Sequence, residues 1–180
     1  TPLLLCSVIN YKHSKNRQNM TTSTAIETVL SPAALLAHWQ GHRGLTRKTI
    51  EAFPEDKLFS YSIGGMRPFA EFVSEMLGMA VPGVSGIATS EWAKWADAAT
   101  VNTKAELLEL WDKATEQIDA IWPTIPAHRW QEQDVAFGQW PGTGISFILY
   151  FADNEIHHRG QGYVYLRSLG IEPPAFWDRP

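Results

Sequence analysis

The chain has 180 residues, of which 44% are hydrophobic and 19% are charged, a size and composition typical of one folded domain. The net charge of −4 argues against nucleic acid as a partner, because a phosphate backbone requires a basic protein face. The one cysteine, Cys6, has no partner within the chain and fits a reducing compartment. No stretch approaches the roughly 20 apolar residues of a transmembrane helix, so we expect a cytoplasmic protein that does not bind membranes.

The first twenty residues differ from the rest of the chain. A short apolar run at residues 2–9 is followed, rather than preceded, by basic residues, which is the reverse of a signal peptide. Met20 then begins a polar run, and it is a candidate for the natural start of the protein. We interpret residues 1–20 as an N-terminal extension outside the core and residues 21–180 as a single domain. The alternative, that the extension belongs to the natural protein, stays open.

Two helices are predicted in the first half of the domain. Ser31 and Pro32 are a typical N-cap and first helical residue, and we expect this helix to end before Pro54. A second helix is predicted to begin near Pro68, where apolar residues recur at steps of three and four. We expect it to end at Pro82, because proline removes a helical hydrogen bond.

Two more helices are predicted in the second half. The first extends from about Thr103 to Trp122 and is followed by prolines. Residues 129–144 are rich in glycine and aromatic side chains, which predicts a loop or a small hairpin over one end of the bundle. The longest helix is expected from about Ile145 to Leu169, with the spacing of an antiparallel bundle seam. Strand signals are few, so the sequence predicts an all-α, antiparallel four-helix bundle.

Polar residues on the last helix are the strongest candidates for a site. Asn154 and His158 are four residues apart and therefore share a helix face, where buried polar groups need partners. Helical bundles commonly build metal or ligand sites between such faces. One alternative is a core histidine that pairs with a carboxylate such as Glu75, which lies at the apolar edge of the second helix. Another is a His157–His158 pair at a dimer surface.

A second candidate is the pair His38 and His42 in the first helix, which has the four-residue spacing of a two-histidine metal grip. No glutamate follows His38 as it does in zincin metalloproteases. Packing or hydrogen bonding of His42 near Trp39 is therefore the simpler interpretation. The sequence has no nucleophile elbow, no phosphate-binding loop and no dinucleotide-binding fingerprint.

Several segments of the chain resemble the DinB-like (damage-inducible B) family. Residues 155–161 read EIHHRGQ and are followed by YLR, LG and PP, which looks like the closing signature of that family. Residues 65–71, with the sequence GMRPFAE, resemble the start of the family's second helix. The similarity extends from about Leu30 to Asp178.

The resemblance implies a four-helix bundle, often dimeric, with three metal ligands that are usually histidines. One ligand comes from the second helix and two come from the last helix. Residue by residue, these positions correspond to Glu75, Asn154 and His158, so one histidine is kept. Imidazole is a strong ligand for zinc and nickel, whereas an asparagine oxygen is weak, which predicts a loosely bound divalent ion. The alternative is that no metal binds and Glu75 forms a hydrogen bond directly with His158.

Some relatives of this bundle are metal-dependent thiol transferases or isomerases, in which the metal lowers the pKa of a low-molecular-weight thiol. The resemblance therefore implies a homodimeric, metal-dependent thiol S-transferase or hydrolase that takes a small-molecule substrate and a low-molecular-weight thiol. Trp39, His42 and the loop around Trp140 are expected to shape its pocket. The alternative is a non-catalytic, stress-associated bundle that binds a partner or dimerises, with a decayed metal site.

Overall fold

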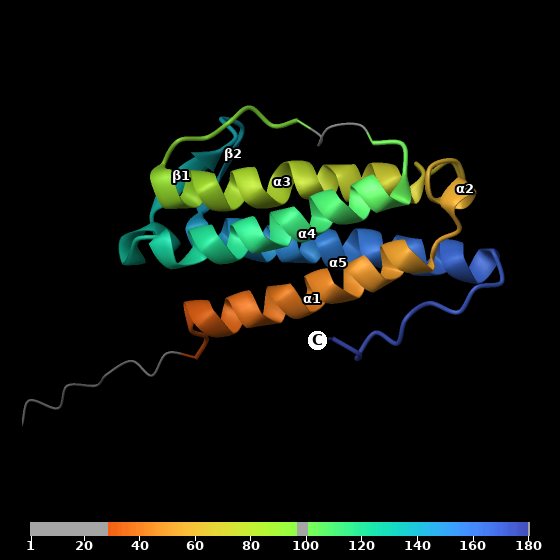
Figure 1. The fold of residues 1–180 in the computed structure, drawn as a ribbon. Helices are drawn as coiled ribbons and strands as arrows, with labels where there is room; N and C mark the ends of the chain where they lie inside the picture. The colour runs from red at the N-terminus through yellow and green to blue at the C-terminus, as the bar shows by residue number, and fades with distance from the viewer. Residues whose placement is uncertain (1–28, 97–100, 180) are drawn as a thin grey trace, which may run out of the picture.

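The structure, a computed structural model, describes residues 29–96 and 101–179 and consists mainly of four long helices. The helices are α1 (Pro32–Ala52), α3 (Phe69–Thr89), α4 (Lys104–Ile121) and α5 (Gly144–Ser168). Helices α1 and α3 each pack against both α4 and α5 (Figure 1). The prediction of an all-α four-helix bundle is confirmed. The predicted extension at residues 1–20 lies outside the described residues.

Smaller elements close the two ends of the bundle. The helical turn α2 (Glu55–Leu58) lies at one end (Figure 1). The short helices η1 (Trp122–Thr124) and η2 (Ala127–Trp130) lead into an antiparallel hairpin at the other end. Its strands are β1 (Gln133–Ala136) and β2 (Trp140–Thr143), which form the small hairpin that the glycine- and aromatic-rich segment predicts.

The direction of the helices brings particular turns together. Helices α1 and α5 run one way along the bundle, while α3 and α4 run the other way (Figure 1). Of the helix pairs that pack together, α1 with α4 and α3 with α5 are antiparallel, whereas α1 with α5 and α3 with α4 are parallel. The early turns of α3 consequently lie beside the later turns of α5, and both candidate segments of the sequence meet there.

Local capping explains where most helices begin. The Ser31 side chain accepts a hydrogen bond from the Ala34 amide, and Pro32 occupies the first turn of α1. Helix α4 begins with a capping box formed by Thr103 and Glu106. These signals depend on neighbouring residues alone, so the sequence predicts the start of both helices closely.

The prediction that the second helix ends at Pro82 is wrong. Helix α3 continues through Pro82 to Thr89. Val84 and Ile87 lie beyond the proline and are 0% and 1% exposed. Each buried aliphatic side chain contributes about 1.5–3 kcal/mol, which offsets the roughly 3 kcal/mol cost of an internal proline.

The expectation that no stretch approaches the apolar length of a transmembrane helix is wrong for α3. Among the described residues, it is the helix long and apolar enough to cross a membrane by length and composition. Most of its apolar window, 61%, is buried against the other helices, as in the core helix of a bundle.

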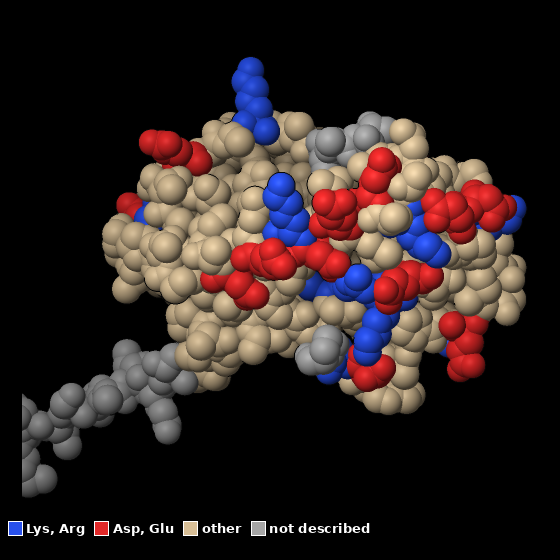
Figure 2. All heavy atoms as spheres, viewed as in Figure 1, with Lys and Arg blue, Asp and Glu red and all other residues tan. Residues whose placement is uncertain are grey.

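Charges of both signs are interspersed on the face shown in Figure 2, which includes α1 and α4. Arg47 of α1 pairs with Glu51 of its own helix and with Asp112 of α4, where Nε and Oδ1 lie 2.6 Å apart. Exposed ion pairs of this kind contribute little to stability, typically below about 1 kcal/mol.

Candidate functional site

The structure brings Glu75, Asn154 and His158 together where α3 packs against α5. Glu75 Oε1 lies 3.0 Å from Nε2 of His158 and accepts a hydrogen bond of 3.2 Å from Nδ2 of Asn154. Asn154 and His158 lie one turn apart on α5, so both side chains reach the same turn of α3. His158 is buried and His157, its neighbour in sequence, is exposed, as the helical spacing predicts.

Two neighbours hold the His158 ring in place. Nδ1 lies 2.7 Å from the amide oxygen Oε1 of Gln161, and the ring stacks on Phe72 with 4.7 Å between centroids. An amide oxygen only accepts, so Nδ1 donates to it and Nε2 is directed toward Glu75. If the imidazole is neutral, the Nε2 lone pair faces a carboxylate oxygen. That arrangement is favourable only with a proton or another cation between the two atoms.

Arg67 provides a cation at this site that the sequence analysis did not assign. Its Nη2 contacts Oε2 of Glu75, and its guanidinium carbon lies 4.9 Å from the centre of the Phe72 ring. Burial of the Glu75 carboxyl opposes ionisation. Hydrogen bonds from Arg67, His158 and Asn154 outweigh burial and lower the pKa of Glu75 below its usual value. Glu75 is therefore a carboxylate at neutral pH.

A pocket of about 650 Å³ adjoins this cluster between α3, α5 and the hairpin, and Glu75 lies on its wall. Its aromatic lining comprises Trp95, Phe137, Trp140, Phe147, Tyr150 and Phe151; we call this space the aromatic pocket. The prediction that the loop around Trp140 shapes a pocket is confirmed. The expectation that Trp39 and His42 also shape it is wrong, because neither residue lines the aromatic pocket.

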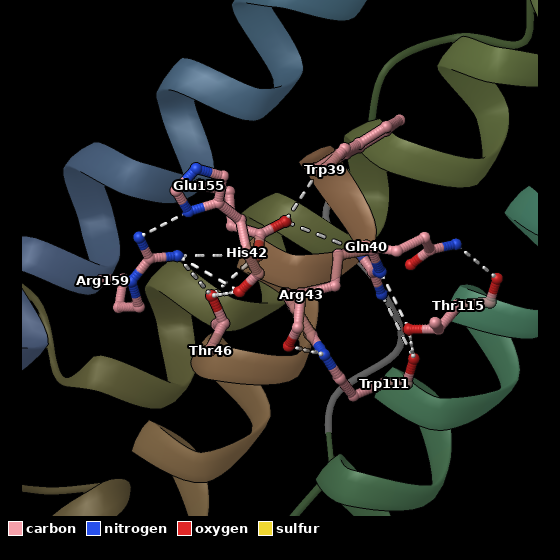
Figure 3. Close-up of polar contacts among 9 residues, drawn as sticks. All are labelled: Trp39, Gln40, His42, Arg43, Thr46, Trp111, Thr115, Glu155 and Arg159. Atoms are coloured by element: carbon pink, nitrogen blue, oxygen red, sulfur yellow. Dashed lines mark hydrogen bonds and ion pairs between the residues drawn. The ribbon is translucent and has the colours of Figure 1, made fainter. Parts of the chain in front are cut away.

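Trp39 instead belongs to a second, fully buried polar cluster around Glu155 (Figure 3). Glu155 is 2% exposed and accepts hydrogen bonds from Trp39 Nε1 at 3.0 Å and Thr46 Oγ1 at 2.7 Å. Arg43 and Arg159 approach the same carboxylate at 3.7 and 4.0 Å. Burial raises the pKa of Glu155, and the two arginines oppose that shift. We call this cluster the Glu155 network; it joins α1 to α5 in the interior.

Both ring nitrogens of His42 lie close to arginine side chains. Its Nδ1 lies 2.9 Å from Arg159 Nη2, and its Nε2 lies 3.0 Å from Arg179 Nη1. His38 stacks edge-on against it at 4.6 Å. Burial, followed by the charges of Arg159, His38 and Arg179, lowers the pKa of His42 to about 4. Because an arginine side chain lies beside each ring nitrogen, His42 is part of the packing between α1 and α5. Packing or hydrogen bonding of His42 is the simpler of the two interpretations of the sequence.

Comparison with known proteins identifies the fold and the family. The sequence model of the DinB family matches residues 20–178. The chain belongs to the DinB family. A solved DinB-like protein from Bacillus subtilis is 20% identical, with a TM-score of 0.66 over 81% of this chain and 99% of that one. A DinB-like protein from Bacillus cereus is 18% identical, with a TM-score of 0.61 over 79% and 95% of the two chains.

At these identities the two solved DinB-like proteins show the fold alone, and the comparison with curated proteins gives no match. The residues of the site therefore have to be judged on their own geometry. Among the described residues there is no group of three histidine, cysteine, aspartate or glutamate side chains that could hold a metal ion. A metal ion at this particular site would depend on one carboxylate, one imidazole and the weaker amide of Asn154.

The geometry of this DinB site nevertheless suits a divalent ion. Two neighbouring ligands about 2.1 Å from an octahedral ion are separated by about 3.0 Å, and around a tetrahedral zinc ion by about 3.4 Å. Glu75 Oε1 and His158 Nε2, at 3.0 Å, match the octahedral separation and would move apart by about 0.4 Å to hold tetrahedral zinc. Oδ1 of Asn154 is buried and has no hydrogen-bond partner in the described part of the chain, so an oxygen ligand is available. The three residues therefore fit a weakly held ion, and their role as metal ligands stays a prediction.

Proposed function

We propose that this DinB protein binds a divalent metal ion, zinc or nickel, through Glu75, Asn154 and His158. We further propose that it acts on a small molecule in the aromatic pocket, as a thiol S-transferase or a hydrolase. One observation carries the proposal: Glu75 both lines the pocket and contacts Nε2 of His158. A ligand in the pocket would thus lie against the proposed metal ligands.

The residues of the site have distinct parts in this proposal. Gln161 fixes the His158 ring so that Nε2 is available, and the lowered pKa of Glu75 keeps its carboxylate ionised. The aromatic walls exclude water and bind the apolar body of the substrate. When bound, a divalent ion would lower the pKa of a coordinated water or thiol.

The lining of the aromatic pocket also restricts the substrate. Among the lining residues that the structure describes, Glu75 is the one charged residue, and none is a lysine or arginine. An apolar body without negative charge is therefore favoured at the walls. A low-molecular-weight thiol as second partner, a homodimeric assembly and a cytoplasmic location remain parts of the proposal.

A second candidate function is a binding or dimer-forming protein without metal. The contact between Arg67 and Glu75 Oε2 favours it, because the carboxylate already has a cation beside it. In this case Glu75 and His158 are linked by a proton, and the aromatic pocket binds its ligand without catalysis.

Zinc titration of the purified protein, in competition with a chromophoric chelator, separates the two candidates. We expect His158→Ala and Glu75→Ala to lose zinc binding by at least about tenfold, which corresponds to about 1.4 kcal/mol. His157→Ala is the matched control, because this exposed histidine precedes His158 and lies outside the cluster. If zinc binds none of the proteins, or binds all of them equally, the metal-dependent function is wrong.

A further inference from the structure

Arg67 is the charged side chain of the site that the proposed function does not use. It lies just before α3, and its side chain extends to Glu75 in that helix, where Nη2 contacts Oε2. The other oxygen, Oε1, faces Asn154 and His158. Both oxygens of one carboxylate are thus engaged, and one of them is held by a permanent positive charge.

The backbone of Arg67 is fixed, whereas its side chain has access to water. Its carbonyl oxygen accepts a hydrogen bond of 2.8 Å from the hydroxyl of Tyr165, and Pro68 restricts the backbone of Arg67, the residue before it. The Arg67 side chain is 41% exposed, compared with 16% for Glu75. The guanidinium can therefore rotate into solvent without a change of the backbone, while Glu75 stays in place.

Asn154 shows that the arrangement with Arg67 is incomplete. Its Nδ2 donates to Glu75, but its buried Oδ1 has no hydrogen-bond partner within the described segments. An unpaired buried oxygen is costly, and a cation beside Glu75 Oε1 would give it a partner once the amide turns. The same cation would place a second positive charge close to Arg67, which weakens the hold of the guanidinium on Oε2.

We infer that Arg67 and a divalent cation compete for the Glu75 carboxylate, so that Arg67 sets the metal affinity of the site. Two states follow. In one, Arg67 neutralises Glu75; in the other, the metal ion binds Glu75, Asn154 and His158 while Arg67 turns toward solvent. This inference rests on the metal site of the proposed function. It adds a positioning role for a residue that touches neither the metal nor the substrate.

Zinc affinity of matched arginine variants tests the competition. Arg67→Gln removes the charge, and we expect zinc to bind it at least about tenfold more tightly than wild type. Arg67→Lys keeps a positive charge but loses the planar guanidinium that binds a carboxylate. Its zinc affinity should therefore lie between those of wild type and Arg67→Gln. The control is Arg47→Gln, which removes an arginine that is paired with Glu51 and Asp112 on α1 and α4. Its zinc affinity should equal that of wild type.

A second measurement uses the unchanged protein, in case the Arg67 variants do not fold. We expect the side-chain Nε–Hε NMR signal of Arg67 to shift with zinc along the same binding curve that the chelator assay gives. A signal that does not move while zinc binds would overturn the inference. So would equal affinities of Arg67→Gln and wild type, which leave the proposed function intact. Absence of zinc binding in every protein would instead refute the metal site itself, and with it the competition.

Discussion

Glu75 Oε1 and His158 Nε2 lie 3.0 Å apart across the contact between α3 and α5. This distance suits both a hydrogen bond and two ligands of one metal ion. In the proposed metal site, Asn154 is the weakest of the three ligands, because an amide oxygen binds zinc or nickel less strongly than an imidazole. Asn154 is therefore the position where a single substitution is most informative.

Replacing Asn154 by histidine should tighten zinc or nickel binding by at least about tenfold, or about 1.4 kcal/mol. Imidazole is a stronger ligand for these ions than an amide oxygen, and the new ring would extend from the same helix face as His158. Competition with a chelator measures the change. Asp153→His provides the control, because residue 153 is exposed and outside the cluster. Equal affinities of Asn154→His and wild type would show that these residues are not metal ligands.

His42 should make the stability of the fold depend on pH in the weakly acidic range. Its pKa is about 4 in the folded protein and 6.5 in its ordinary state, so the unfolded chain binds more protons between these values. The stabilisation is complete above about pH 6.5 and decreases as the pH falls toward about 4. Urea unfolding at pH 7.5 and 5.0 measures the decrease. We expect His42→Gln to reduce the difference between the two midpoints, and His157→Gln to preserve it.

Two glycines in α5 should respond in opposite ways to the same substitution. A Cβ on Gly162 would lie 2.4 Å from the buried ring of Phe69, whereas a Cβ on Gly160 would have nothing within 4 Å. Gly162→Ala should therefore destabilise the protein by about 1–3 kcal/mol through overpacking. Gly160→Ala should stabilise it by up to about 1 kcal/mol through helix propensity. Urea unfolding compares them; a similar effect of both substitutions would contradict the packing of α5 on α3.

Deletion of residues 1–19 should leave the melting temperature nearly unchanged. Their composition matches no element of the bundle, and the DinB family match begins at residue 20. Thermal unfolding followed by circular dichroism measures the effect. A decrease of more than about 8 °C, equivalent to roughly 1–2 kcal/mol or more for a domain of this size, would show that the segment contributes to the fold.

Local signals made much of the fold predictable. Ser31 and Thr103 act on amides within three residues, so the sequence alone indicates where α1 and α4 begin. The effect of Pro82 was not predictable from its neighbours, because α3 continues on account of side chains that are buried by other helices. A local rule cannot include that contribution.

The site was predictable to the extent that it follows helix periodicity and family resemblance. The four-residue spacing of Asn154 and His158 places them on one face of α5, and the resemblance adds Glu75. The part played by Arg67 depends on the turn before α3, which determines whether the side chain reaches Glu75. The hydrogen-bond partners of Glu155 cannot be predicted from helical spacing either, because Thr46 and Trp39 lie 109 and 116 residues away in the sequence.

The contact between Glu75 and His158 joins residues that are 83 positions apart in the chain. The loop that it closes contains all of α4 and the hairpin, so the two halves of the site do not meet in a chain that has lost its long-range packing. A metal ion that bridges these residues would act as a reversible crosslink. At a free concentration of one hundred times its Kd, such an ion adds about 2.7 kcal/mol to the free energy of unfolding. The fold would then be most resistant to unfolding and proteolysis in cells that are rich in that metal.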